Sequence, residues 1–191
     1  MIIGNRVYLR ELRRDDMKMT LSWRNDIKLK SMTMSHPFPV TSEIEDKWYD
    51  TALNSDQTKR SYYAICKKDT SEIIGYIFLG DFDWISRHCC WGGLIGDGSN
   101  QGKGLGREAV NLIINFAFEF LNMNKVYAWV RSDHPALKTW LRTGAVIEGE
   151  LMEYYWNGTS YHSVSIISWN QKSRTDFDND DSADQGDSLL S

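Results

Sequence analysis

The clearest apolar pattern in the chain lies between Gly106 and Leu121. Its apolar residues recur at steps of three and four: Val110, Ile113, Ile114, Ala117, Phe120 and Leu121. Spacing close to 3.6 residues gathers such side chains on one face of a helix. The pattern therefore predicts an amphipathic helix over 106–121 with this face buried.

Other segments have the patterns expected of strands. Arg6–Leu12 alternates polar and apolar residues, which is typical of a half-buried strand. Polar or glycine-containing turns bound the other predicted strands, at 61–68, 73–80, 88–95, 125–130, 145–156 and 161–169. Asn157-Gly158 joins the last two and is a strong β-hairpin signal. We therefore expect about seven strands.

Three further helices are predicted from their start signals. Asp15 or Asp16 is expected to cap a helix that runs to about Asn25, and Thr41-Ser42 to open one through Leu53. Pro135 at a first turn opens a helix ending near Gly144, and 30–40 is expected to be a loop. The order of elements predicts an α+β fold, with about four helices flanking a central, mostly antiparallel twisted sheet.

Charge separates the chain into a body and a tail. The 191 residues carry a net charge of −4, from 22 basic and 26 acidic side chains. Two basic and six acidic residues lie in 172–191, so 1–171 is neutral. A neutral body argues against nucleic-acid binding, which needs a basic face. We expect one domain over 1–171 and a disordered acidic tail over 172–191.

The cysteines and the lengths of the apolar runs indicate the cellular compartment in which the protein is expected to work. Cys66, Cys89 and Cys90 are odd in number with two adjacent, which suits neither a disulfide framework nor a zinc site. No apolar run approaches the ~18 residues of a membrane span, and the N-terminus has no signal-peptide pattern. We expect a cytoplasmic protein with reduced thiols, no metal and no membrane partner.

The most informative motif is Gln101-Gly102-Lys103-Gly104-Leu105-Gly106, between a predicted strand and the long helix. Unpaired N–H groups at a helix N-terminus suit a phosphate, and glycines let the backbone approach it. The motif is not a P-loop, because no Ser or Thr follows Lys103. Its G-x-G-x-G spacing also differs from the dinucleotide fingerprint.

This motif resembles the Q/R-x-x-G-x-G/A signature of GNAT-type N-acetyltransferases. The likeness spans about residues 6–170, because the order of strands and helices also agrees. Arg6–Leu12 and Trp23–Asp26 are similar to the RimJ/RimL-like branch, whose members acetylate protein N-termini, amino sugars, polyamines or antibiotics. The resemblance implies a GNAT-like sheet, acetyl-CoA as co-substrate and direct transfer of its acetyl group to an amine.

The resemblance also implies residues that bind the co-substrate. Leu94, Ile95 and Gly96 would run beside the pantetheine arm. The pyrophosphate would bind at the loop, formed by Gln101, Gly102, Lys103, Gly104, Leu105, Gly106 and Arg107. Asp133 stands where the family has an Asn that contacts CoA. Family strands splay at this point, and Gly92-Gly93 is suited to a bulge there.

The sequence departs from the family at its usual acid and base positions. Trp91 and Ala128 replace two Glu residues, and Trp140 replaces a Tyr. An indole N–H donates hydrogen bonds but does not give up its proton near neutral pH. Other acids or bases could serve instead, at Asp81, Asp83, His134, Glu150, Glu153, Tyr154 or Tyr155. We favour such groups acting with a water chain, and take Trp140, Asp83 and His134 as catalytic candidates.

The predicted acceptor side is rich in tryptophan. Trp84 and Trp156 are the indoles best placed to face a ligand, and Trp23 and His36 are further candidates, His36 in a loop that borders the acceptor in this family. Aromatic faces beside carboxylates suit a sugar ring or an ammonium group. This favours a small primary amine such as an amino sugar. The alternatives are acetylation of a (ribosomal) protein N-terminus and a silent acyl-CoA-binding module. A homodimer is a further alternative to a monomer.

Overall fold

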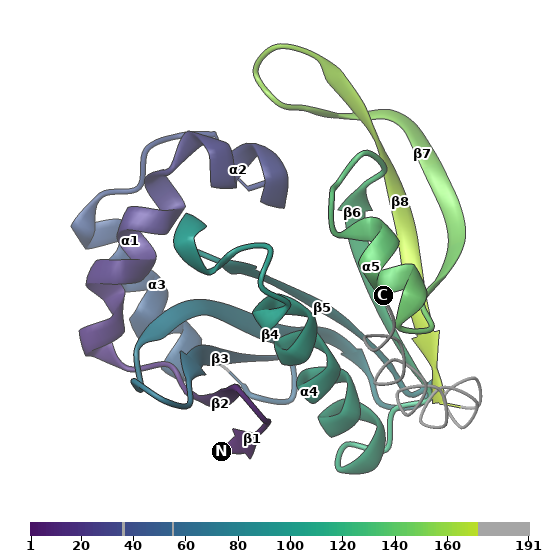
Figure 1. Ribbon diagram of the computed structural model, residues 1–191, viewed down its shortest axis with the longest axis horizontal. Coiled ribbons are helices and arrows are strands. Elements are labelled where there is room, and N and C mark those ends of the chain that lie inside the picture. The colour runs from purple at the N-terminus through teal and green to yellow at the C-terminus, as the bar shows by residue number, and fades with distance from the viewer. Residues whose placement is uncertain (36, 55, 172–191) are drawn as a thin grey trace, which may run out of the picture.

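A computed structural model describes residues 1–35, 37–54 and 56–171. An eight-stranded sheet runs through the molecule in the order β1-β2-β3-β4-β5-β6-β8-β7 (Figure 1). Its strands are β1 Ile2–Ile3, β2 Val7–Glu11, β3 Arg60–Lys67, β4 Ile73–Asp83, β5 His88–Ile95, β6 Lys125–Arg131, β7 Val146–Trp156 and β8 Tyr161–Asn170. The α+β prediction is confirmed. The predicted tail, 172–191, lies outside the described residues.

In the described part of the chain, five α-helices flank the sheet: α1 Met17–Asn25, α2 Ile27–Thr33, α3 Ser42–Asn54, α4 Leu105–Glu119 and α5 Leu137–Arg142. In Figure 1, α1, α2 and α3 gather at one side of the molecule, and the β7–β8 hairpin extends at the other. The long helix α4 connects β5 to β6, the only parallel neighbours in the described sheet. Every other pair is antiparallel.

The sheet opens between β5 and β6. These strands pair only at His88, Cys89 and Cys90 of β5, opposite Lys125, Val126 and Tyr127 of β6. Beyond Cys90, β5 keeps its pairing with β4, while β6 continues along β8. The second half of β5 therefore has a backbone edge that faces no strand in the described structure. A splayed sheet of this kind is what the GNAT resemblance implied.

The bulge expected at Gly92-Gly93 is not there. Gly92 and Gly93 pair in register with Phe78 and Ile77, and the irregularity of β4–β5 lies at Gly80–Asp83. The glycines serve close packing instead. A Cβ on Gly92 would lie 2.6 Å from the Phe78 ring, and a Cβ on Gly93 would lie 2.5 Å from the Tyr76 carbonyl oxygen.

The main core lies between the sheet and α4, whose predicted apolar face is confirmed for four residues. Val110, Ile113, Ile114 and Ala117 are buried there. Phe120 was placed on this face wrongly. Because α4 ends at Glu119, Phe120 lies beyond the helix, is 76% exposed and stacks on Phe116.

The segment 30–40, expected to be a loop, begins as helix. Asp26 caps α2, because its carboxylate accepts hydrogen bonds from the N–H groups of Lys28 and Leu29. The helix then runs to Thr33. Helix α2 was not predicted from the sequence because it begins directly after α1. The capping Asp26 between the two helices lies in a polar segment that shows no clear break.

Of the other predicted helix caps, the one at α3 is present and the one at α1 is not. Thr41 does cap α3, since its hydroxyl accepts from the Ile44 N–H at 3.3 Å. Asp16 does not cap α1 with its side chain, which accepts from the Arg13 N–H and pairs with Arg10 instead. Helix α5 starts at Leu137, two residues after Pro135.

Candidate active site

The glycine motif forms a tight loop that leads into α4. Gly102 and Gly104 have φ angles of 71° and 76°, in the left-handed region that favours glycine. Gly104 is the N-cap of α4, and its carbonyl accepts from the Glu108 N–H at 3.1 Å. The N–H groups of the first turn, from Leu105 to Arg107, therefore have no acceptor within the helix. This loop can hold an anion such as a phosphate.

Two side chains fix this loop to the rest of the fold. Glu108 accepts hydrogen bonds from the backbone N–H groups of Arg6 (2.8 Å) and Val7 (3.2 Å) and from the Arg6 guanidinium (3.1 Å). Arg6 Nη1 in turn donates to the Lys103 carbonyl at 2.9 Å. Burial raises the pKa of Glu108, but these donors outweigh it and the pKa is lowered overall. Glu108 therefore ties β2 to α4 as a carboxylate.

The predicted loop residues differ in what they present. The Gln101 side chain donates to the Ile95 carbonyl at 3.0 Å, so it holds the loop against β5. Leu105 is buried in the core. Lys103 and Arg107 are exposed, and they place two positive charges around the glycines. The structure therefore brings the predicted loop residues together at one helix terminus.

Trp23 packs against the strand that leads to the loop. A Cβ on Gly96 would fall 2.0–2.4 Å from the Trp23 ring, so the indole occupies the space beside that glycine. Trp23 is only 5% exposed. It was predicted to bind the substrate, and the structure places its side chain against Gly96, almost fully buried.

Helix α2 closes one end of the splayed sheet. Arg131 of β6 donates to the Ser31 carbonyl at 2.9 Å, and the Tyr155 hydroxyl of β7 donates to the Lys30 carbonyl at 3.3 Å. The buried Lys30 ammonium donates to the Phe38 carbonyl at 2.7 Å, which holds the following loop in place. His36, a predicted substrate residue of that loop, lies outside the described residues.

A cluster of charged side chains lies at the end of β6, next to α2. The Asp133 carboxylate accepts from Arg131 Nε (2.9 Å) and Nη2 (2.6 Å), and His162 Nδ1 lies 3.0 Å away. Hydrogen bonds from Arg131 lower the pKa of Asp133 despite its partial burial. Asp133, predicted to contact CoA, is thus engaged with Arg131 and His162. Sequence reasoning missed this cluster because its members come from two separate strands.

Two of the catalytic candidates lie side by side. The rings of His134 and Trp140 stack with centroids 5.2 Å apart and planes 16° apart. His134 Nδ1 accepts from the Ala136 N–H at 3.1 Å, so the neutral ring carries its hydrogen on Nε2. Burial lowers the pKa of His134, which favours that neutral form. Trp140 also meets Trp91 edge to face, with centroids 5.4 Å apart.

The third catalytic candidate lies elsewhere. Asp83 is opposite His88, where β5 begins, whereas the glycine loop follows the other end of β5. Its carboxylate accepts from the N–H groups of Ile85 and Ser86 and so caps a turn. Asp83 and the glycine loop therefore lie at opposite ends of β5, and a catalytic role for Asp83 stays a prediction.

The two remaining predicted substrate residues also lie away from the loop. Trp84, next to Asp83, stacks on Phe82 and donates to the Thr58 carbonyl at 3.0 Å. Trp156 packs on Tyr161 beside the turn of the β7–β8 hairpin. Both indoles are about half exposed, and their ring contacts are with Phe82 and Tyr161.

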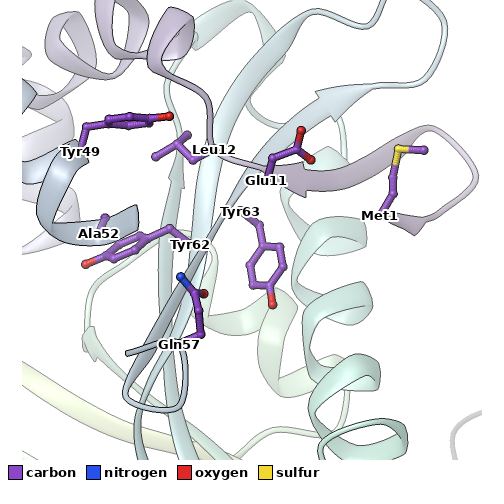
Figure 2. Close-up of a pocket in the computed structure, with 8 residues that line it drawn as sticks. All are labelled: Met1, Glu11, Leu12, Tyr49, Ala52, Gln57, Tyr62 and Tyr63. Carbon is purple, nitrogen blue, oxygen red and sulfur yellow. The ribbon is translucent and has the colours of Figure 1, made fainter. Parts of the chain in front are cut away.

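A pocket of about 330 Å³ lies on another part of the surface (Figure 2). It is lined by Met1, Glu11, Leu12, Tyr49, Ala52, Gln57, Tyr62 and Tyr63. Glu11 ends β2, whereas Arg6, which holds the glycine loop, immediately precedes that strand. The pocket therefore lies at the far end of β2 from the loop, and no Lys, Arg or His is among the residues that line it. We do not assign the active site to it.

Within residues 1–35, 37–54 and 56–171, no three or more Asp, Glu, His or Cys side chains come together in a way that could hold a metal ion. In the same stretches, no helix combines the length and the apolar character needed to cross a bilayer.

The splayed sheet, the parallel β5–β6 pair and the glycine loop between them together define an acetyltransferase fold. Residues 6–143 match the family described as the acetyltransferase (GNAT) domain. The chain belongs to this family, and it is therefore an N-acetyltransferase that uses acetyl-CoA as co-substrate.

Named relatives agree with this assignment. The chain is 29% identical over 162 residues to the spermidine N(1)-acetyltransferase of Escherichia coli K12, covering 84% of each chain. It is 25% identical over 163 residues to the Vibrio cholerae enzyme of the same name, covering 85% of this chain and 91% of that one. The crystal structure of a Vibrio cholerae spermidine N-acetyltransferase with CoA and spermine superimposes with a TM-score of 0.82 at 22% identity, over 90% and 99% of the two chains.

These findings refine the sequence-based assignment. The GNAT family is confirmed, whereas the relatives carry the name of polyamine acetyltransferases and do not single out a RimJ/RimL-like branch. The silent-module alternative gives way to an enzyme.

Proposed function

We propose that this enzyme acetylates a primary amine of a small polyamine. The observation that carries the proposal is the match, over 84–85% of the chain, to two enzymes named spermidine N(1)-acetyltransferase. A polyamine is a flexible cation, so its site needs aromatic faces and carboxylates rather than a deep apolar pocket.

We place the co-substrate along the free edge of β5 and at the glycine loop. The N–H groups of Gly102–Arg107 would hold the pyrophosphate, with Lys103 and Arg107 beside it. The edge of Leu94–Gly96 that faces away from β4 would lie beside the pantetheine arm and pair with its amides, as an added strand does. The site fits this ligand, because the glycines at 102 and 104 leave room that a side chain would fill. Acetyl-CoA supplies the activated acetyl group.

We place the amine on the other side of the splay, between α2 and β6–β7. Trp129 of β6 is 42% exposed and packs on Tyr154 of β7, with ring centroids 5.7 Å apart. Arg131, two residues along the same strand, contacts Ser31 of α2, so Trp129 lies on the face of β6 that α2 approaches. The half-exposed Asp133 carboxylate is near this end. An ammonium group could rest on the indole with a carboxylate nearby.

The structure weakens the case for an amino sugar. That preference rested on Trp84 and Trp156 as ring-stacking surfaces, and they lie at the closed end of the sheet and at the hairpin turn. Among the other acid and base candidates, the Asp81 carboxylate pairs with Arg60, and the Tyr155 hydroxyl donates to the Lys30 backbone carbonyl. We propose that the amine loses its proton through water rather than directly to either group.

The test is an acceptor panel assayed by release of free CoA thiol. Spermidine and spermine are expected to turn over, whereas glucosamine and peptides with free N-termini should give at most a few per cent of that rate. Turnover with glucosamine or peptides alone would contradict the polyamine proposal without affecting the acetyltransferase assignment.

Trp129→Ala should raise the KM for spermidine about five- to tenfold, because the indole face for the ammonium is lost. The KM for acetyl-CoA should stay within twofold. Trp156→Ala is the matched control, since it removes a similarly exposed indole from the hairpin turn, and both KM values should be unchanged. Steady-state kinetics of the three proteins decide the matter, and equal effects of the two variants would remove Trp129 from the acceptor site.

We also propose that the protein self-associates through β7. This strand is an edge of the sheet and exposes apolar side chains, among them Ile147 (51%), Met152 (73%) and Tyr154 (59%). Exposed edges of this kind favour pairing between chains. A Vibrio cholerae spermidine N-acetyltransferase has been solved as a dodecamer. Light scattering should therefore give a mass of at least two chains, and a 22.1 kDa monomer would contradict self-association.

A further inference from the structure

The indole of Trp91 carries a buried hydrogen-bond donor. The residue is 5% exposed, and its Nε1 has no hydrogen-bond partner among the described residues. Buried polar groups are nearly always paired, since an unpaired one loses its bond to water without compensation. A donor left unpaired in this way needs an explanation.

The position of Trp91 in the fold suggests one. Cys90 is the last residue of β5 that pairs with β6, so Trp91 is the first residue of β5 beyond the fork of the splayed sheet. A pantetheine arm that enters at the glycine loop and runs along the free edge of β5 must end at this fork. The acyl end of the co-substrate would then reach the neighbourhood of Trp91.

The surroundings of Trp91 point to the same place. Its ring meets Trp140 of α5 edge to face at 5.4 Å and Trp169 of β8 at 6.0 Å. Trp140 stands where the resemblance places the family's tyrosine acid, which acts at the sulfur. These rings supply no hydrogen-bond acceptor for Trp91, because indole is a donor only. Trp169 Nε1 already donates to the Thr143 carbonyl at 3.1 Å.

We infer that Trp91 Nε1–H is a hydrogen-bond donor to the thioester group of bound acetyl-CoA. In this chain, an indole donor at the fork would do the polarising part of the work that a tyrosine hydroxyl does in the family, while transferring no proton. An apolar environment strengthens such a bond. The inference rests on the proposed placing of the co-substrate along β5, and it does not depend on which amine is acetylated.

Two buried tryptophans allow a matched test. Trp91→Phe keeps an aromatic ring and removes an unused donor, so it should lower the melting temperature of the unliganded protein only by the cost of the cavity it leaves. Trp169→Phe leaves a similar cavity and also removes a donor that is hydrogen-bonded, so it should lower the melting temperature further. For acetyl-CoA affinity, the order of the two effects should be reversed. Trp91→Phe should bind acetyl-CoA about five- to tenfold more weakly by calorimetry, and Trp169→Phe should bind it normally.

Adenosine 3′,5′-bisphosphate, which has the nucleotide end without the arm, separates this inference from the placing of the loop. It should bind wild type and Trp91→Phe equally. In ¹H–¹⁵N spectra, the indole resonance missing from Trp91→Phe should move downfield with acetyl-CoA and stay in place with the bisphosphate. No movement with acetyl-CoA, or equal acetyl-CoA affinity of wild type and Trp91→Phe, would overturn the inference. Failure of the bisphosphate to bind even wild type would instead count against the proposed loop site.

Discussion

Gly104→Glu is expected to weaken the binding of acetyl-CoA at least a hundredfold, which corresponds to about 2.7 kcal/mol. Gly104 is the N-cap of α4 with φ 76°, and a Cβ there would lie 3.2 Å from Arg6 Nη2. The new carboxylate would stand where we place the pyrophosphate and would repel it. It would also attract Arg6 and the helix terminus, so the unliganded fold should survive. Calorimetry with acetyl-CoA measures the loss.

Gly104→Lys separates charge from backbone strain. Both variants force a side chain into the left-handed conformation, at a cost of about 1–2 kcal/mol, but Lys adds a positive charge. Gly104→Lys should therefore bind acetyl-CoA more tightly than Gly104→Glu. Gly149→Glu adds the same carboxylate in β7, where the glycine has open space, and should bind normally. Equal losses of acetyl-CoA affinity in the Lys and Glu variants would show that backbone strain alone causes them. That result would contradict phosphate binding at this loop.

The loop could be predicted from the sequence because its signal is local. The glycines at 102 and 104 are needed for their left-handed conformation, and the apolar face of α4 follows directly after them. Strand β5 was predicted with its observed bounds, His88–Ile95, because it too is a continuous local pattern. Among the elements of the described residues, the two-residue strand β1, the short helix α2 and two three-residue 3₁₀ helices, Arg14–Asp16 and Gly98–Asn100, were not predicted.

The rest of the site depends on contacts between distant segments. Asp133 looks like a cofactor contact in sequence, yet its partner His162 lies 29 residues away across two strands. Asp83 and Trp84 neighbour β5 in sequence, but the hairpin places them at the strand's closed end. The unpaired Trp91 donor likewise becomes visible only when every neighbouring group is placed.

Glu45→Ala is expected to destabilise the fold by about 3 kcal/mol, or roughly 6–12 °C in melting temperature. Glu45 of α3 is 1% exposed and accepts hydrogen bonds from the Thr20 hydroxyl and Arg24 of α1, both at 2.5 Å. Removing the carboxylate leaves a largely buried guanidinium without its counter-charge. The cost should fall at the lower end of the range for buried pairs, because the Arg24 side chain is 26% exposed. Thermal and urea unfolding measure it.

Glu43→Gln is the matched control, since it changes an exposed carboxylate two residues away on α3 and should shift the melting temperature by less than 2 °C. The double variant Arg24→Met, Glu45→Leu tests the cause, because replacing both charges with apolar groups of similar size should recover most of the loss. If the double variant were as unstable as Glu45→Ala, the penalty would come from packing rather than from an unpaired charge. The pair also matters for the site. Arg24 adjoins Trp23, which packs beside Gly96, so a loosened α1 should also weaken the binding of acetyl-CoA.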